Sequence, residues 1–421
     1  MGNKMKRAVL VPTALVVSAC SSTQLQLPPA PVNIVEDSVS LATPGGRIFG
    51  TLELPAQRFP VHVALIIAGS GPTDRNGNSI ALPGANNSLM LLARGLAERG
   101  VASLRYDKRG IAASKAAMTK EEDIRFEDYI ADAEGWIAQI RADPRFSTIT
   151  VVGHSEGSLI GMIAAREARA DAFVSLEGAG RNAKDIIIAQ LAVQLPAPVV
   201  EQARSIMGKI EAGQQVDSVP PFLAPLFRPS VRPYLVSWFR YTPSLEMAKL
   251  SIPALVIQGT TDIQTSEEDA KLLSAALPSS RLVMIDGMNH VLKTAPAGRA
   301  AQGPAYSDPS LPVVPKLLDE VAEFVRKTRR SRSKPADPIL GVDKVKHFFI
   351  AGFVEALTFS GLQAAGADRS PARGAAIGAA AVVSFGREIH DQRTKGLFSV
   401  KDLVWDALGA GAALLVINKT R

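Results

Sequence analysis

Cysteine is almost absent from this sequence of 421 residues, in which Cys20 is the only one. A disulfide bond within one chain is therefore excluded. Aromatic residues make up only 5% of the chain, although hydrophobic residues in total reach 47%. A core built mainly from Ala, Val, Leu and Ile suits a parallel sheet that is buried on both faces. At this length we expect more than one domain.

Long apolar runs are also missing. The first run, at residues 8–17, is interrupted by proline and is too short to cross a bilayer. It follows a basic start and ends in Val17-Ser18-Ala19-Cys20, which resembles a bacterial lipobox. We therefore expect a lipoprotein signal peptide at 1–19, lipidation of the cysteine, and a tether at 20–33. An ordinary secretory signal is the alternative.

This leader predicts a membrane-anchored lipoprotein of the bacterial cell envelope that faces the periplasm. Ser21 follows the cysteine in place of aspartate, which by resemblance to enterobacterial sorting favours the outer membrane over the inner one. The net charge of +7 does not indicate a nucleic-acid partner, because much of the basic excess lies at the chain start and at residues 326–334. The second block predicts a basic linker at 329–342.

Between these segments, residues 34–328 alternate between strand and helix patterns. Residues 34–54 read as an antiparallel hairpin around Pro44-Gly45-Gly46. The succession that follows predicts an α/β fold with a mostly parallel sheet. Strands are expected at 62–68, 102–106, 148–153, 172–176, 253–259 and 281–285, and helices at 88–99, 126–142, 159–167 and 314–325.

The alternation stops at about residues 181–250, where helical patterns and prolines replace strands. We interpret this part as a helical cap over the carboxyl edge of the sheet, where open α/β sheets bind their ligands. Its aromatic residues are expected either to line an apolar pocket or to form the core of the cap: Phe222, Phe227, Tyr234, Trp238, Phe239 and Tyr241.

The run Gly153-His154-Ser155-Glu156-Gly157 joins a predicted strand to a predicted helix. A strand that enters a helix through Gly-x-Ser-x-Gly turns so sharply that the serine hydroxyl is raised above the sheet as a nucleophile. A serine hydroxyl needs a nearby base, and the base needs a carboxylate that orients it. The pattern therefore predicts Ser155 as a catalytic nucleophile.

Only five histidines are available as the base, and His290 alone follows a late strand of the domain. Asp262 follows the preceding strand at the same edge, and Asp286 is the rival acid. The chain order Ser155, Asp262, His290 is that of α/β-hydrolases.

The oxyanion formed in such a reaction needs two N–H donors. Glu156 is expected to supply one from its backbone.

The second donor is expected from the loop at residues 69–78, with Ser70 preferred to Gly71 because Pro72 has no N–H. This glycine-rich loop lacks the end of a P-loop and the spacing of a dinucleotide fingerprint. We therefore expect no cofactor and no catalytic metal.

Five motifs within residues 34–328 together resemble bacterial α/β-hydrolases of the esterase D type and of the serine aminopeptidase-like group. The resemblance implies a carboxylesterase with an α/β-hydrolase fold. It departs from the family pattern at Ile111-Ala112-Ala113-Ser114, where relatives carry another glycine. Arg105, Asp107 and Arg109 are interpreted as a structural ion network. The motifs are residues 69–78, 105–110, 153–157, 261–264 and 287–293.

Residues 343–421 are expected to form a small all-α domain associated with the membrane. Helices are predicted at 345–365, 372–391 and 400–418, and whether they span the bilayer stays open because no uninterrupted apolar run reaches about 18 residues. The segment resembles small lipoproteins of the YfiM type and, more distantly, VanZ-like membrane proteins. Four polar side chains are expected to converge as a hydrogen-bond cluster rather than a metal site: His347, Glu388, Asp391 and Asp406.

These observations predict a lipid-anchored serine hydrolase that cleaves small-molecule carboxylic esters through an acyl-enzyme. Serine aminopeptidase and thioesterase activities are the alternatives within the enzyme class, since a fold does not choose among them. A membrane scaffold with a vestigial hydrolase domain is the alternative from another class. The expected partners are the ester and the membrane, without nucleic acid.

Overall fold

The computed structural model of this protein describes residues 34–330, 342–395 and 399–419, without the side chains of 342–343, 390–395 and 419. The predicted signal peptide, the tether with Cys20 and most of the basic linker lie outside the described residues. The chain divides into two compact units, residues 1–330 and 331–421.

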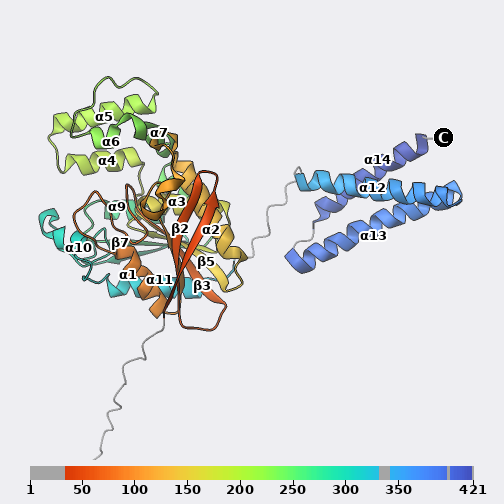
Figure 1. The fold of residues 1–421 in the computed structure, drawn as a ribbon, viewed down its shortest axis with the longest axis horizontal. Coiled ribbons are helices and arrows are strands. Elements are labelled where there is room, and N and C mark those ends of the chain that lie inside the picture. The colour runs from red at the N-terminus through yellow and green to blue at the C-terminus, as the bar shows by residue number, and fades with distance from the viewer. Residues whose placement is uncertain (1–33, 331–341, 396–398, 420–421) are drawn as a thin grey trace, which may run out of the picture. The chain divides into compact units, whose positions relative to one another are not determined.

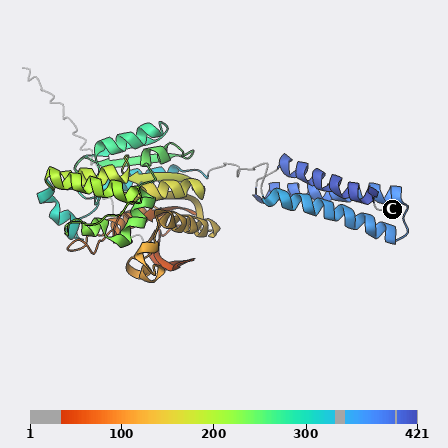
Figure 2. The same ribbon diagram turned by 90° about the horizontal axis from the view of Figure 1, so that it is seen from above.

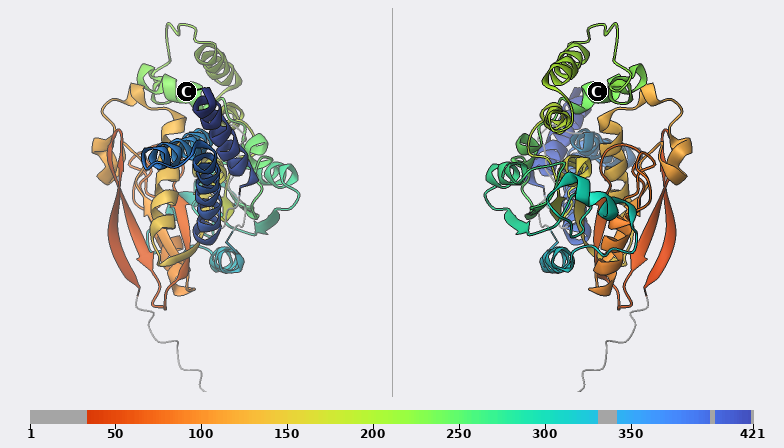
Figure 3. Two further views of the ribbon diagram at one scale, coloured as in Figure 1. Left: turned by 90° about the vertical axis from the view of Figure 1, so that its right-hand side faces the viewer. Right: turned by 90° about the vertical axis from the view of Figure 1, so that its left-hand side faces the viewer.

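An eight-stranded sheet forms the centre of the first unit (Figure 1). Its strand order is β1-β2-β4-β3-β5-β6-β7-β8. β1 and β2 form the predicted hairpin, β2 pairs antiparallel with β4, and all later pairs are parallel. Figure 3 shows this hairpin, coloured red, at the outer edge of the sheet. The strands are β1 (Val35–Thr43), β2 (Gly46–Leu54), β3 (Val61–Ile67), β4 (Ala102–Tyr106), β5 (Phe146–His154), β6 (Ala172–Leu176), β7 (Ala254–Gly259) and β8 (Arg281–Ile285).

Both faces of the central strands are buried, which explains their continuous apolar sequences. Along β3, Val63 and Leu65 pack into one core with α2 and α3, whereas Ala64 and Ile66 pack into a second core with α1 and α11. This arrangement follows from the period of two in a strand. The flanking helices are α1 (Ser88–Glu98), α2 (Phe126–Ala142), α3 (Glu156–Glu167), α9 (Glu267–Ala276), α10 (Gly303–Ser307) and α11 (Pro315–Lys327).

Five α-helices and one 3₁₀ helix (Pro229–Val231) lie between β6 and β7 and form the predicted cap. Figure 1 shows α4 to α7 gathered at one end of the sheet. They enclose a core of their own that includes Ile206, Phe227 and Phe239. The cap helices are α4 (Ala183–Ala192), α5 (Ala197–Glu211), α6 (Ala224–Phe227), α7 (Arg232–Trp238) and α8 (Pro243–Met247).

The second unit consists of the predicted helices, α12 (Val342–Ala364), α13 (Arg369–Lys395) and α14 (Val400–Lys419), which lie side by side in Figure 2. Its burial pattern differs from that of a water-soluble bundle, although Phe359, Ala372, Ala376 and Ile417 form a small apolar core. Large apolar side chains lie outside, including Phe349, Phe353, Leu357, Val382, Phe385, Val404 and Leu415. Polar side chains lie inside, namely Lys344, His347, Glu355, Ser384, Glu388, Ser399 and Asp406. Among the described helices, α12 is long and apolar enough at Lys344–Ala364 to cross a membrane, judged by length and composition only.

Candidate active site

The turn from β5 into α3 has the strained geometry predicted for a nucleophile elbow. Ser155 has φ 55° and ψ −122°, a conformation that non-glycine residues rarely adopt. A Cβ atom at Gly153 would lie 2.2 Å from the Gly157 carbonyl oxygen, and one at Gly157 would lie 2.3 Å from the Ile67 carbonyl oxygen. Both positions therefore require glycine, because the start of α3 packs directly against the backbone of β3 and β5.

His290 and Asp262 meet beside this elbow, in loops that follow β8 and β7. The His290 Nδ1 and Asp262 Oδ2 atoms are 2.7 Å apart, and their side chains are 5% and 0% exposed. Burial alone would raise the pKa of Asp262, but the adjacent His290 and the backbone N–H of Gln264 hold this pKa below its usual range. Asp262 is therefore an ionised acceptor that can orient the imidazole.

His154 connects the elbow to the His290 loop. Its Nε2 lies 2.7 Å from the carbonyl oxygen of His290, and the two rings are 4.9 Å apart. Burial, and then the neighbouring His290, lower the pKa of His154 to about 3. His154 is therefore neutral and donates to that carbonyl, so it positions the loop.

Within residues 34–330, no hydrogen bond joins the Ser155 hydroxyl to the His290 imidazole. Hydrogen bonds between a catalytic serine and its base are often long before substrate binds.

Asp286, the rival acid, is exposed and accepts a hydrogen bond from the Thr260 hydroxyl at 3.1 Å. A second carboxyl, which no sequence motif predicts, lies at the site instead. Glu177 directly follows β6, is fully buried and has φ 48°. The Gly259 N–H donates to both of its carboxyl oxygens, at 2.9 and 3.1 Å. Glu177 could have been found from the sequence by one feature, because it directly follows a predicted central strand and so lies at the carboxyl edge of the sheet.

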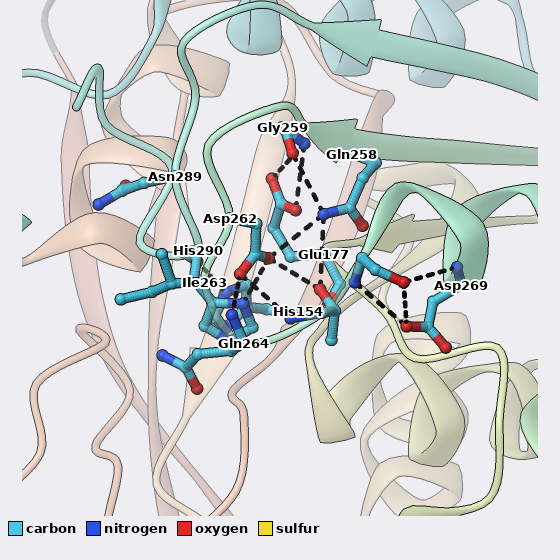
Figure 4. Close-up of polar contacts among 12 residues, drawn as sticks. His154, Glu177, Gln258, Gly259, Asp262, Ile263, Gln264, Asp269, Asn289 and His290 are labelled. Carbon is cyan, nitrogen blue, oxygen red and sulfur yellow. Dashed lines mark hydrogen bonds and ion pairs between the residues drawn. The ribbon is translucent and has the colours of Figure 1, made fainter. Parts of the chain in front are cut away.

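Burial, followed by the negative charge of Asp262, raises the pKa of Glu177 well above its usual range. Glu177 is therefore expected to keep its proton to a higher pH than an exposed glutamate does. Asp262 is also held by the Thr265 hydroxyl, 2.8 Å from Oδ2, and by the more distant Gln258 amide at 3.3 Å. Figure 4 shows Glu177, Gln258 and His290 gathered around Asp262. The carboxylate beside His290 thus sits in a dense set of donors.

Residues 69–78 follow β3 and pass close to the elbow. A Cβ atom at Gly69 would lie 3.1 Å from the Ser155 Cβ. Asp74 and Asp107 hold the loop: Asp74 accepts from the backbone N–H groups of Asn76 and Asn78, and Asp107 binds Arg75 at 2.7 Å. Ser70, the predicted donor residue, is exposed and lines the same cavity as Ser155.

The segment at 105–109 forms a network of ion pairs around this loop, as interpreted from the sequence. Arg105 binds Glu53 at 2.6 Å, and Arg109 donates to Asp132 at 2.8 Å through Nε. In the run that departs from the family pattern, Ala112 has φ 43° and begins a short 3₁₀ helix, Ala112–Ala117. A non-glycine residue thus adopts a left-handed backbone within this run.

A cavity of about 550 Å³ lies between the elbow and the cap. Three of the cap aromatics, Phe227, Tyr234 and Trp238, line the cavity and also contact the cap core. Phe239 is buried in the cap core, and Tyr241 packs against the main core of the unit instead. Phe222 neither lines the cavity nor joins the cap core and is 56% exposed. The remaining wall is mostly apolar, with Leu159, Ala179, Ile186, Ile187, Leu226 and Leu235.

In the helical unit, His347 and Asp406 meet as expected, with 3.1 Å between Nδ1 and Oδ1. Glu388 accepts from the backbone N–H of Ser399 at 2.8 Å. Asp402, which was not among the four predicted residues, lies 3.7 Å from the His347 Nε2. The side chain of Asp391 lies outside the described residues.

Potential metal ligand atoms of His347, Glu388 and Asp402 lie within 4.8 Å of one another. The Lys344 ammonium, however, is 2.6 Å from Asp402 and already supplies a positive charge there. The described side chains of this cluster therefore fit an ion and hydrogen-bond network better than a metal site.

Comparison with known proteins relates part of this chain to hydrolases. Residues 86–218 match the family Hydrolase_4, described as "Serine aminopeptidase, S33". The chain is 24% identical over 286 residues to Esterase EstD of Thermotoga maritima, which covers 66% of this chain and 65% of that relative. The chain thus spans slightly less than two thirds of the relative's length.

Among solved structures, the chain is similar to Est1E from Butyrivibrio proteoclasticus with bound ferulic acid, at 19% identity and a TM-score of 0.44 over 69% of this chain and 96% of that one. It is also similar to the α/β hydrolase GrgF from Penicillium sp. sh18, at 18% identity and a TM-score of 0.47 over 70% and 99%. The protein has the α/β-hydrolase fold. The family match and the sequence relative support a hydrolase related to esterases.

Proposed function

We propose that this protein is a serine carboxylesterase that uses Ser155, His290 and Asp262 as a catalytic triad. The observation that carries the proposal is the His290–Asp262 pair, 2.7 Å apart, beside the strained elbow that holds Ser155. These three residues come from loops after β5, β8 and β7, and their order along the chain is typical of an α/β-hydrolase triad.

In the first half of the reaction, the Ser155 Oγ attacks the ester carbonyl carbon while His290 Nε2 takes the hydroxyl proton. The His290 Nδ1–H donates to Asp262, which fixes the tautomer and stabilises the imidazolium. The negative charge that develops on the carbonyl oxygen is stabilised by the backbone N–H groups of Glu156 and Ser70. His290 then protonates the departing alcohol, and the acyl group stays on Ser155.

In the second half, water attacks the acyl-enzyme with His290 as the base, and the acid is released. The apolar wall between elbow and cap suits the acyl chain of a small to medium ester.

An aminopeptidase needs a carboxylate that binds the substrate's ammonium group. Among the residues that the structure describes, Glu156 is the one acidic residue lining this cavity, and Lys108 and Tyr234 already bind its carboxylate. This occupied carboxylate favours an ester over a peptide with a free amino end.

Two assays test the proposal. A fluorophosphonate probe should label Ser155 in the folded protein, and Ser155→Ala should abolish both labelling and ester hydrolysis. Hydrolysis rates for p-nitrophenyl esters of increasing acyl length, measured beside aminoacyl anilides, should favour the esters. Preference for the anilides would refute the esterase, whereas a folded protein without an adduct would favour a scaffold.

We further propose that the protein is attached to a bacterial envelope membrane by a lipid on Cys20 and by the helical unit. The apolar exterior and polar interior of α12, α13 and α14 support the second attachment. With 23 residues, α12 is roughly 35 Å long, enough for a hydrocarbon core of about 30 Å. Cys20→Ala should therefore lose the lipid but stay in the membrane fraction after carbonate extraction. Its release into the soluble fraction would refute membrane embedding of the helices.

A further inference from the structure

Lys108 is a charged side chain that the proposed mechanism does not use, although it is almost completely buried. Its side chain is 2% exposed, and its ammonium lies 2.6 Å from the Gly69 carbonyl oxygen and 3.0 Å from the Glu156 carboxylate. The ammonium is also 5.1 Å from the centre of the Tyr129 ring. A buried lysine is costly unless its charge and its hydrogen bonds are satisfied.

Each acceptor of Lys108 is directly connected to one of the two N–H groups of the proposed oxyanion hole. The Gly69 carbonyl and the Ser70 N–H are the two ends of one peptide group. Because that group is planar and trans, a donor that holds the oxygen also fixes the opposite direction of the N–H. The positive charge at the oxygen further polarises the N–H and strengthens it as a donor.

Glu156, the second acceptor, carries the other proposed donor on its own backbone. Its carboxylate lies between Lys108 and the hydroxyl of Tyr234, which donates to it from α7 of the cap. Burial, and then the charge of Glu156, raise the pKa of Tyr234 well above its usual range, so this hydroxyl stays protonated. Tyr234 also lines the cavity. A cap residue within reach of the substrate therefore binds the side chain of Glu156, whose backbone carries one of the two proposed oxyanion donors.

We propose that Lys108 is a positioning residue that orients both oxyanion donors, and that Tyr234 links this arrangement to the cap. The inference rests on the proposed esterase function, and it changes no proton transfer in it. The rival explanation is a buried ion pair that only stabilises the fold. The two explanations differ in what happens when both charges of the pair are removed together.

The decisive variants are Lys108→Met and the double variant Lys108→Met with Glu156→Gln. The single variant leaves a buried carboxylate without its cation and is expected to lower both Tm and activity. The double variant removes both charges, keeps side chains of similar length and leaves an amide for Tyr234, so it should regain most of the lost Tm. Its kcat should nevertheless stay about 10- to 100-fold below wild type, somewhat less than the ~10²- to 10³-fold cost of deleting an oxyanion donor.

The matched control is the double variant Arg166→Met with Glu246→Gln, which removes an ion pair of 2.8 Å at the far end of the same helix, α3. It should leave kcat unchanged.

A trifluoromethyl ketone forms an adduct with Ser155 that places an anion in the oxyanion hole. Its binding should weaken in the Lys108 double variant by the same factor as kcat. KM for the ester should change little. Tyr234→Phe should give a smaller loss of kcat in the same direction.

A Lys108 double variant with wild-type kcat and wild-type ketone affinity would overturn the inference, and so would an equal loss in the control. Fluorophosphonate labelling of the wild-type enzyme separates this failure from failure of the proposed function. If wild type is labelled at Ser155 and hydrolyses esters, the comparison of variants tests Lys108 alone. If wild type is neither labelled nor active, the esterase proposal fails and the inference fails with it.

Discussion

Replacing Glu177 by glutamine should change how the stability of the hydrolase unit depends on pH. The carboxyl is fully buried against Asp262, and its pKa is raised well above the usual value. The folded state therefore keeps a proton that the unfolded chain releases above the ordinary glutamate pKa of 4.5. Wild-type stability is fully present below that pH and is lost as pH rises toward the folded pKa.

One proton held in this way changes the free energy of unfolding by at most about 1.4 kcal/mol per pH unit, or roughly 3 kcal/mol between pH 5 and pH 7. Glutamine has nearly the same shape, accepts from Gly259 through its oxygen and donates to Asp262 through its amide, without titrating. Glu177→Gln should therefore lose less stability than wild type as pH rises, and its esterase activity at pH 7 should stay close to wild type.

Urea unfolding at pH 5, 6, 7 and 8 measures this difference. The background should carry Trp405→Phe, so that fluorescence reports only Trp136 and Trp238 in the hydrolase unit. Glu246→Gln is a suitable control: burial opposes ionisation there, but Lys249 and Arg166 keep its pKa lowered, so its contribution is lost at low pH instead. Parallel pH profiles for wild type and Glu177→Gln would refute the assignment of a retained proton.

Three further outcomes are expected. Asp262→Asn should reduce kcat by about 10³- to 10⁴-fold in ester hydrolysis, because the imidazole loses its orienting carboxylate; a loss below tenfold would contradict the triad. Gly157→Ala should cost about 3 kcal/mol or more in unfolding experiments, since its Cβ would lie 2.3 Å from a carbonyl oxygen of β3; wild-type stability would show that the elbow can relax. Leu226→Trp should shift the p-nitrophenyl ester preference to shorter acyl chains by filling the cavity, whereas Phe222→Ala, at an exposed cap position outside it, should not; identical profiles for both variants would mean that acyl chains bind elsewhere.

Much of the fold could be predicted because its signals are local. Buried parallel strands have continuous apolar sequences, so β3 and β7 were recognisable without tertiary information. The elbow depends on two glycines within five residues of one another. Asp262 and His290 could be predicted to meet because the carboxyl ends of neighbouring parallel strands share one edge of a sheet.

The supporting residues of the site could not be found in this way, because their partners are distant in sequence. Lys108 joins Gly69 and Glu156, which are 39 and 48 residues away, and no periodicity relates these positions. His154 is adjacent to Ser155, yet its role depends on a carbonyl 136 residues later. In the helical unit, the choice of Asp402 as a partner of His347 depends on the rotation of α14 against α12.

The sequence by itself determined where the central strands lie along the chain and where the Gly-x-Ser-x-Gly turn around Ser155 falls, because both follow from short-range backbone geometry. Only the tertiary structure decided which buried groups keep a proton and which ammonium holds the oxyanion loop. Those properties depend on burial and on the distance between charges, and both arise only when remote segments pack together.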